Sequence, residues 1–164
     1  MFDWMTERRR AVNLAAAAGC VFLIAFAYYL ELVHGMAPCP LCIVQRGIFL
    51  LLGVGFLVAG LHAPHRARWY AAAVGAIAAL GVAVAGRHLW LQSLPPERVP
   101  ACGPGLGYML EVFPLLEVAR AVLTGSGECA EVERWLGVSI PAWSLAAFLL
   151  LGALAIAANL RRTS

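Results

Sequence analysis

The chain has 164 residues, of which 62% are hydrophobic and 13% are charged. Soluble globular domains are about 45–50% apolar and about 25% charged, so this composition excludes an ordinary soluble domain and indicates one small integral membrane protein. The net charge of +3 is small, and the basic residues form no stripe with interleaved aromatic residues, which argues against a nucleic-acid partner.

Four apolar segments are long enough to cross a lipid bilayer, which takes about 20 residues. They cover approximately residues 11–33, 42–61, 69–90 and 140–160. Glycine and alanine are frequent in all four segments, as expected where helices pack closely in lipid. We therefore expect residues 1–164 to form a single domain, an all-α bundle of four transmembrane helices.

The arginines in the short polar segments predict the orientation of this bundle. Seven of the twelve lie before the first span, between the second and third, or after the fourth: Arg8, Arg9, Arg10, Arg66, Arg68, Arg161 and Arg162. Because short arginine-rich segments stay in the cytoplasm, both termini are expected there. The two other connections, about residues 34–41 and 91–139, are then expected on the outer side.

The N-terminal arginines and the apolar run after them also resemble a secretory signal, and AAGC at residues 17–20 resembles a lipoprotein cleavage site. The apolar run continues past Cys20 to Val33, whereas a cleaved signal ends in small residues followed by polar sequence. We therefore expect a membrane span here, with Cys20 buried as a small hydrophobic side chain.

The long outer connection contains the sequence PLLEVARAVL at residues 114–123. Pro114 suits a first helical position, and Glu117, Arg120 and Thr124 share one helical face with leucines and valines opposite. The pattern predicts a short interfacial helix on the membrane surface. An amphipathic turn that packs on the connection itself is the alternative.

Four cysteines in the polar connections limit the kinds of chemistry that the protein can carry out. They are Cys39, Cys42, Cys102 and Cys129. Four cysteines on one side indicate either disulfides in an oxidising compartment or a metal site. A zinc ribbon requires a second Cys-x-x-Cys or histidines at ligand spacing, and a c-type haem requires His directly after Cys42, where Ile43 stands. We therefore expect no metal.

The segment PCPLCIVQR at residues 38–46 has the spacing of a redox-active cysteine pair. Because Pro38 and Pro40 delay helix formation, Cys42 is expected in the first turn of the second span, where the helix N-terminus stabilises a thiolate. Arg46 lies one helical turn deeper on the same face, where it favours that thiolate and offers donors to a polar headgroup. The alternative is a structural disulfide beside an arginine that extends to the membrane surface.

Three further residues are candidates for the same chemistry. Cys102 and Cys129 lie in accessible, Pro- and Gly-rich sequence, so they form either a structural staple or an exchange-competent disulfide. His88 lies near the outer end of the third span, beside Arg87. An ionisable group at such depth is either a functional residue or an interfacial anchor.

Together these features resemble the DsbB family, the bacterial inner-membrane disulfide bond formation proteins that reduce quinone. The resemblance covers essentially the whole chain and is carried by PCPLCIVQR, RHLWLQSLP at the end of the third span, GECAEVERWLG around Cys129, and PAWSL at the start of the fourth span. It implies a multi-pass protein of the inner membrane with its redox cysteines in the periplasm. Pro40, between the paired cysteines, departs from the family pattern and should alter the reduction potential of the pair.

The resemblance also implies a reaction sequence. A reduced, DsbA-like thioredoxin-fold oxidase attacks Cys102 of a Cys102–Cys129 disulfide. Cys129 then attacks the Cys39–Cys42 disulfide at Cys39, and Cys42 passes two electrons to a membrane quinone, either ubiquinone or menaquinone. The residues that match the quinone site of the family are Arg46 and His88.

Two other functions stay open at the level of the sequence. A four-span thiol reductase of the vitamin K epoxide reductase-like type uses similar cysteine chemistry, but it usually carries its Cys-x-x-Cys near the end of a later span, whereas here the pair opens the second. A non-enzymatic tetraspan protein would use the disulfides only to brace its outer connections.

Overall fold

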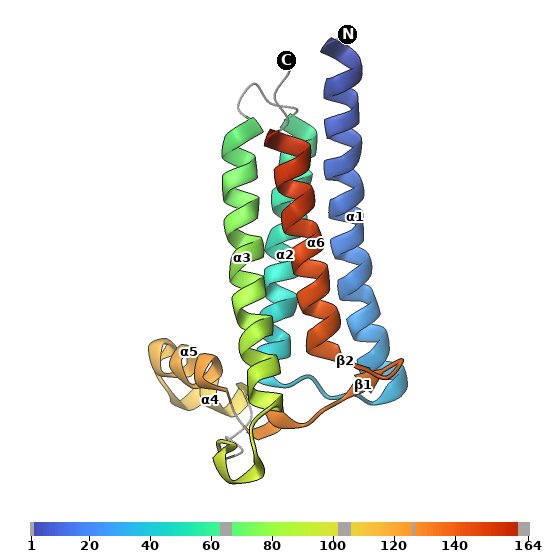
Figure 1. Cartoon of the computed structure of the whole chain (residues 1–164). Coiled ribbons are helices and arrows are strands. Elements are labelled where there is room, and N and C mark those ends of the chain that lie inside the picture. The colour runs from blue at the N-terminus through green and yellow to red at the C-terminus, as the bar shows by residue number, and fades with distance from the viewer. Residues whose placement is uncertain (1, 63–66, 102–105, 126, 161–164) are drawn as a thin grey trace.

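Four long helices dominate the structure, a computed structural model that describes residues 2–62, 67–101, 106–125 and 127–160 (Figure 1). They are α1 (Phe2–His34), α2 (Pro40–His62), α3 (Ala67–Gln92) and α6 (Ile140–Leu160). Each contains a stretch that is long and apolar enough to cross a membrane. The predicted all-α bundle of four membrane-spanning helices is therefore confirmed.

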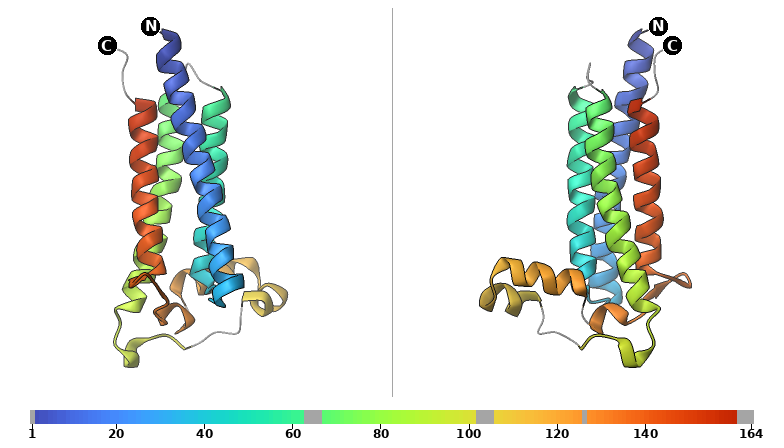
Figure 2. Two further views of the ribbon diagram at one scale, coloured as in Figure 1. Left: turned by 90° about the vertical axis from the view of Figure 1, so that its right-hand side faces the viewer. Right: turned by 60° about the vertical axis from the view of Figure 1, so that its left-hand side comes forward.

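The helices run up and down, so the start of α1 and the end of α6 lie at the same end of the bundle (Figures 1 and 2). We call this the terminal end, and we call the opposite end, which carries the connections after α1 and α3, the loop end. Helix α3 packs extensively on α6, α1 packs on α2, and α2 packs on α3. The contact between α1 and α6 is smaller.

Small residues and aromatic rings fit the helices together in the middle of the bundle. The rings of Phe49 on α2 and Phe148 on α6 are stacked, with their centroids 4.1 Å apart. A Cβ atom at Gly81 of α3 would overlap the ring of Phe148, so the close approach of α3 and α6 requires glycine there. A Cβ atom at Gly53 of α2 would lie 3.2 Å from the Cβ of Cys20 on α1, and Cys20 is fully buried, as predicted.

A pair of buried amides joins α1 and α6 near the terminal end. The Nδ2 of Asn13 donates to the Oδ1 of Asn159, and the Nδ2 of Asn159 donates to the Oδ1 of Asn13, both over 3.3 Å. Each amide also donates to a backbone carbonyl of its own helix. Polar side chains inside a membrane bundle are stabilised by such mutual hydrogen bonds, so Asn13 interrupts the apolar segment without interrupting the helix.

The loop end holds several short elements. They are η1 (Pro96–Arg98), α4 (Leu106–Val112), α5 (Leu115–Thr124), η2 (Gly127–Ala130), β1 (Arg134–Trp135) and β2 (Val138–Ser139). Helix α5 corresponds to the helix expected at residues 114–123. Helix α4 and the two strands were not expected, because elements of this length carry too few residues for a periodic pattern.

Helices α4 and α5 project sideways from the loop end (Figures 1 and 2). Met109 of α4 packs with Val118 and Val122 of α5, and Val44 of α2 packs against this cluster. The leucines at the start of α5 point away from it, with Leu115 76% exposed. An exposed apolar face of this kind is typical of a helix that lies in the membrane interface.

Strands β1 and β2 form a short antiparallel hairpin across the loop end. The paired residues are Arg134 with Ser139 and Trp135 with Val138. The turn between them consists of Leu136 and Gly137, both at positive φ (52° and 82°), as a two-residue hairpin turn requires. The ring of Trp135 contacts Phe26 of α1 and Trp143 of α6, with centroids 4.9 and 5.9 Å away, so the hairpin connects these two helices.

Candidate functional site

The cysteine pair lies where α2 begins. Cys39 immediately precedes the helix, and Cys42 is in its first turn, as predicted. The backbone N–H of Cys42 donates to the sulfur of Cys39 over 3.4 Å, and the two sulfurs lie 3.3 Å apart as thiols. Pro40 suits this arrangement because a first-turn residue has no intrahelical use for its N–H. The free N–H groups of the first turn favour a thiolate at this point.

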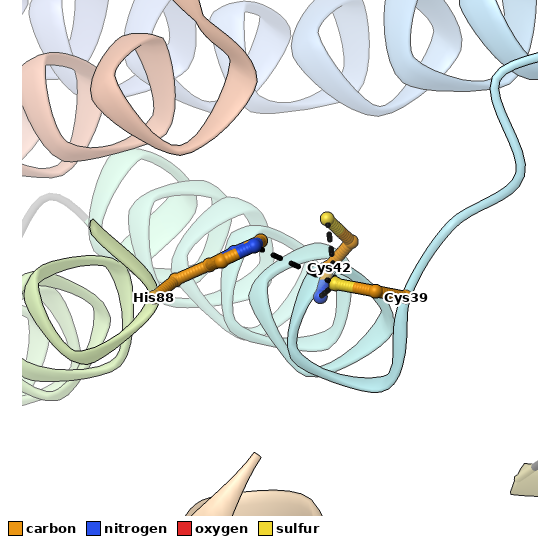
Figure 3. Close-up of side chains that lie close together, drawn as sticks. All are labelled: Cys39, Cys42 and His88. Carbon is orange, nitrogen blue, oxygen red and sulfur yellow. Dashed lines mark hydrogen bonds between the residues drawn. The ribbon is translucent and has the colours of Figure 1, made fainter. Parts of the chain in front are cut away.

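His88 reaches the pair from the loop end of α3 (Figure 3). Its Nε2 lies 3.7 Å from the Sγ of Cys39, and its Nδ1 lies 3.2 Å from the Nε2 of Gln45 on α2. Both His88 and Gln45 are buried. Because an amide nitrogen only donates, Nδ1 of His88 accepts in this arrangement and the ring proton on Nε2 points at Cys39.

Arg46 lies one turn deeper than Cys42, as expected, but its strongest contacts are with α1. Its Nη1 donates to the carboxylate of Glu31 over 2.5 Å, and its Nη2 donates to the carbonyl oxygen of Ala27 over 3.3 Å. The guanidinium carbon lies 4.8 Å from the centre of the Tyr28 ring. Three neighbouring residues of α1 therefore hold the guanidinium group in one position.

Glu31, Tyr28 and Gln45 were not predicted as site residues. Glu31 carried a signal, because a carboxylate that closes an apolar span is costly unless it has a partner. Gln45 carried a weaker one, as a buried amide in an apolar helix. Their partners lie on other helices, so spacing along the chain did not reveal the contacts.

An apolar cavity of about 450 Å³ lies between α1, α2 and α6, beneath the hairpin. Aromatic and aliphatic side chains form most of its wall, among them Phe26, Leu30, Phe49 and Trp143. Its polar groups are few: Cys42, Gln45 and Arg46 of α2, with Glu133 and Ser144 elsewhere on the wall. Apolar cavities with a few convergent polar groups are the usual form of a small-molecule site.

A second cavity, of about 160 Å³, also borders the cysteine pair. Cys39, Cys42 and His88 line it together with Gln92, and three glutamates form the rest of its polar lining. The glutamates are Glu128, Glu131 and Glu133. Burial, and then the negative charge of Glu131, raise the pKa of the Glu133 carboxyl above its usual value. This pocket is therefore polar and negatively charged, in contrast to the first.

Cys42 lines both cavities, and Glu133 is the acidic residue common to them. The dithiol thus separates a polar pocket at the loop end from an apolar cavity between helices. The two other predicted site residues are divided between the cavities: Arg46 lines the apolar cavity, and His88 lines the polar pocket.

Cys129 lies in η2, which packs against α3. Its side chain is fully buried in the same core cluster as Cys39, and the partly buried Cys42 packs against that cluster. Cys102, the remaining predicted cysteine, lies outside the described residues. The structure therefore brings together three of the four predicted redox cysteines and His88.

These features define a class: a multi-pass membrane protein with a dithiol at the first turn of a spanning helix. A family model described as disulfide bond formation protein DsbB matches residues 9–158. The chain belongs to this family of multi-pass, disulfide-forming oxidoreductases of the inner membrane.

Individual relatives are similar to this protein in sequence along most of the chain. It is 48% identical to the disulfide bond formation protein B of Nitrosococcus oceani over 140 residues, which cover 84% of this chain and 83% of the relative. It is 52% identical to the protein of the same description from Chromohalobacter salexigens over 136 residues, 80% of this chain and 79% of the relative. The corresponding protein of Acinetobacter baumannii is 51% identical over 132 residues, which cover 78% of this chain and 77% of the relative.

Proposed function

We propose that this protein reoxidises a DsbA-like thioredoxin-fold oxidase in the periplasm and transfers the electrons to a membrane quinone, ubiquinone or menaquinone. The observation that carries the proposal is the position of Cys42, which borders both the polar pocket and the apolar cavity. A dithiol that couples a water-soluble donor to a lipid-soluble acceptor needs access to both.

The first half of the reaction is disulfide exchange on the polar side. The partner, a dithiol, becomes a disulfide as it reduces a Cys102–Cys129 disulfide. Cys129 then attacks the Cys39–Cys42 disulfide at Cys39, which releases Cys42 and forms a Cys129–Cys39 mixed disulfide. Cys102 attacks Cys129 of this mixed disulfide, which re-forms Cys102–Cys129 and releases Cys39. The burial of Cys129 in one cluster with Cys39 supports the second step, because exchange requires the three sulfurs to approach one another. Each exchange conserves electrons: one disulfide breaks as another forms.

The residues that border the apolar cavity fit a quinone. The cavity offers a largely apolar space of about 450 Å³, with the donors of Arg46 and Gln45 beside Cys42. A quinone, when bound, accepts two electrons and two protons as the dithiol becomes a disulfide. Arg46 stabilises negative charge at Cys42, and its N–H donors bind a carbonyl oxygen; Glu31 and Tyr28 keep the guanidinium group from turning into the interface.

His88 has a different part in this proposal. The proton on its Nε2 stabilises a thiolate at Cys39, the sulfur that must attack Cys42 when the inner disulfide re-forms. Gln45 holds the ring in place by its contact with Nδ1 and borders the apolar cavity, so His88 reaches the quinone site through this amide.

The experiment combines the purified protein with a reduced DsbA-like oxidase and a quinone in detergent, and follows the quinone absorbance. The proposal expects quinone reduction in proportion to partner oxidised, and none with the Cys42→Ser variant. If the partner stays reduced and the quinone unchanged, the cysteines only brace the loop end and the proposal is wrong.

A further inference from the structure

We infer that the reduced Cys39–Cys42 pair and His88 form a binding site for a zinc ion, and that bound zinc arrests the protein in its reduced state. The arrest rests on the proposed function, whereas the binding does not. The ligand atoms come from Cys39 just before α2, Cys42 in its first turn and His88 on α3, and they lie within 4.8 Å of one another (Figure 3).

The spacing of these atoms approaches that of a zinc centre. Tetrahedral zinc, with bonds of about 2.3 Å to sulfur and about 2.0–2.1 Å to nitrogen, holds two sulfurs about 3.8 Å apart and a sulfur and a nitrogen about 3.5 Å apart. Here the sulfurs of Cys39 and Cys42 lie 3.3 Å apart, and the Sγ of Cys39 lies 3.7 Å from the Nε2 of His88. Small side-chain rotations suffice to place all three around one ion.

Gln45 supplies the outer contact that a histidine ligand needs. Metal-bound histidine uses one ring nitrogen for the metal and donates the proton on the other to an acceptor. The amide of Gln45, 3.2 Å from Nδ1, presents its oxygen to this proton when the side-chain amide is turned over. The same residue therefore supports either tautomer of His88.

The polar pocket gives a zinc ion access to the thiols and surrounds it with negative charge. Cys39, Cys42 and His88 all border it, and so do Glu128, Glu131 and Glu133. A divalent cation bound among these carboxylates offsets their mutual repulsion. The rim thus concentrates cations beside the thiols and offers oxygen ligands or bound water for the fourth position.

Binding is coupled to the redox state of the pair. Zn²⁺ displaces one proton from each thiol and forms two Zn–S bonds and one Zn–N bond, with two protons released and no change of oxidation state. The disulfide form has no thiolates to offer, so the site exists only after the pair is reduced. While zinc is bound, both sulfurs hold the metal and no disulfide forms.

The test measures zinc affinity of the full-length, reduced protein in detergent by competition with a chromophoric chelator. We expect about one equivalent per chain for the wild type and none for the oxidised protein. His88→Gln, Cys39→Ser and Cys42→Ser should each weaken binding by at least about tenfold. His34→Gln is the matched control, since His34 is also a loop-end histidine but is exposed and stacks on Tyr29. Cobalt(II) in place of zinc should show a thiolate-to-metal charge-transfer band that Cys42→Ser abolishes.

Two results would overturn the binding claim: unchanged affinity in all three variants, or loss of binding in Cys102→Ser/Cys129→Ser, which would move the site to the other cysteines. The activity arm adds stoichiometric zinc to protein that turns over in zinc-free buffer, and inhibition should be reversed by a chelator. If zinc binds but turnover is not inhibited, the claim that zinc arrests the protein is wrong. Absence of turnover in zinc-free buffer contradicts the proposed function instead, and the binding result then stands by itself.

Discussion

The guanidinium group of Arg46 has two neighbourhoods, the carboxylate of Glu31 on one side and the apolar cavity beside Cys42 on the other. An arginine side chain is long and flexible, so its position in an interface depends on what holds it. Here the neighbouring helix does so, and the cation is partly neutralised before any ligand binds. This favours a neutral ligand with carbonyl oxygens over an anion.

Glu31→Gln removes the charged partner and leaves the shape of the side chain. An ion pair with side chains 18% and 31% exposed is worth about 1 kcal/mol or less, so unfolding should change little. The apparent KM for quinone should rise about threefold to fivefold with kcat nearly unchanged, because Arg46 is less often in position. Steady-state kinetics check this, with Glu31→Asp as the control that retains the charge. An unchanged KM would mean that Glu31 pairs with Arg46 without affecting the binding of quinone.

The cysteines should separate into two functional pairs. Cys39→Ser or Cys42→Ser is expected to lower quinone-coupled turnover by at least about a thousandfold, because the sulfur that transfers the electrons is gone. Cys102→Ser should lose oxidation of the protein partner but keep quinone reduction driven by dithiothreitol, a small thiol that reaches the inner pair directly. Partner oxidation at the normal rate by Cys102→Ser would contradict the order of exchange.

Glu133 is expected to make the fold sensitive to pH. Its folded-state pKa is raised by burial and by Glu131, so the protonated form is favoured in the folded state. The stability it contributes is complete below the usual carboxyl pKa and is lost as the pH rises through the folded value. The melting temperature of Glu133→Gln, relative to wild type, should therefore increase between pH 4 and pH 8. Glu128→Gln on the same rim is the control; an equal gain at every pH would contradict the prediction.

At the scale of elements, the long helices follow from the length of the apolar runs, which needs no knowledge of tertiary contacts. The start of α2 follows from Pro38 and Pro40, and α5 from its amphipathic face and Pro114. The hairpin does not, since its turn places Leu136 at positive φ, where about 1–2 kcal/mol of backbone strain must be offset by contacts made elsewhere. Those contacts come from the ring of Trp135, which packs against Phe26 of α1 and Trp143 of α6. A local sequence pattern does not reveal contacts between segments so far apart in the chain.

Helix α3 offers a matched test of how tightly the bundle is packed. Gly81→Ala places a methyl group against the ring of Phe148 and should destabilise the protein by about 1–3 kcal/mol. Gly75→Ala lies on the same helix with nothing within 4 Å of the new Cβ, and should be neutral or stabilise by up to about 1 kcal/mol. Thermal unfolding in detergent compares the two. Equal effects would show that α3 and α6 separate more easily than their contact indicates.

At the scale of the whole molecule, the site was predictable in part. The cysteine spacing, the thiolate-favouring helix start and the position of Arg46 are local features, and sequence alone indicated them. The two cavities are not local: α1, α2, α6 and the hairpin line one of them, and the start of α2, the end of α3 and η2 contribute to the other. Sequence therefore named most of the residues that gather at the candidate site, and packing determines what each one contacts.

The orientation of the molecule is the remaining global prediction. The arginines at the terminal end favour the cytoplasm, so the cysteines at the loop end should face the periplasm. A fluorescent protein fused after Ser164 should fold and fluoresce, whereas alkaline phosphatase fused there should be inactive, because it needs periplasmic disulfides. Phosphatase inserted after Pro95 should be active. The reverse pattern would invert the molecule and contradict the proposed partner.

The amides of Asn13 and Asn159 fasten α1 to α6 at the terminal end, while the apolar cavity separates the same two helices toward the loop end. Phe22 and Leu150, which line that cavity, are more than 60% exposed on the lipid-facing surface. The cavity is therefore lined at its lipid-facing side by residues of both α1 and α6. The quinone proposed above would reach the cavity by diffusing in the plane of the bilayer, so its occupancy would follow its mole fraction among the lipids and not its concentration in water.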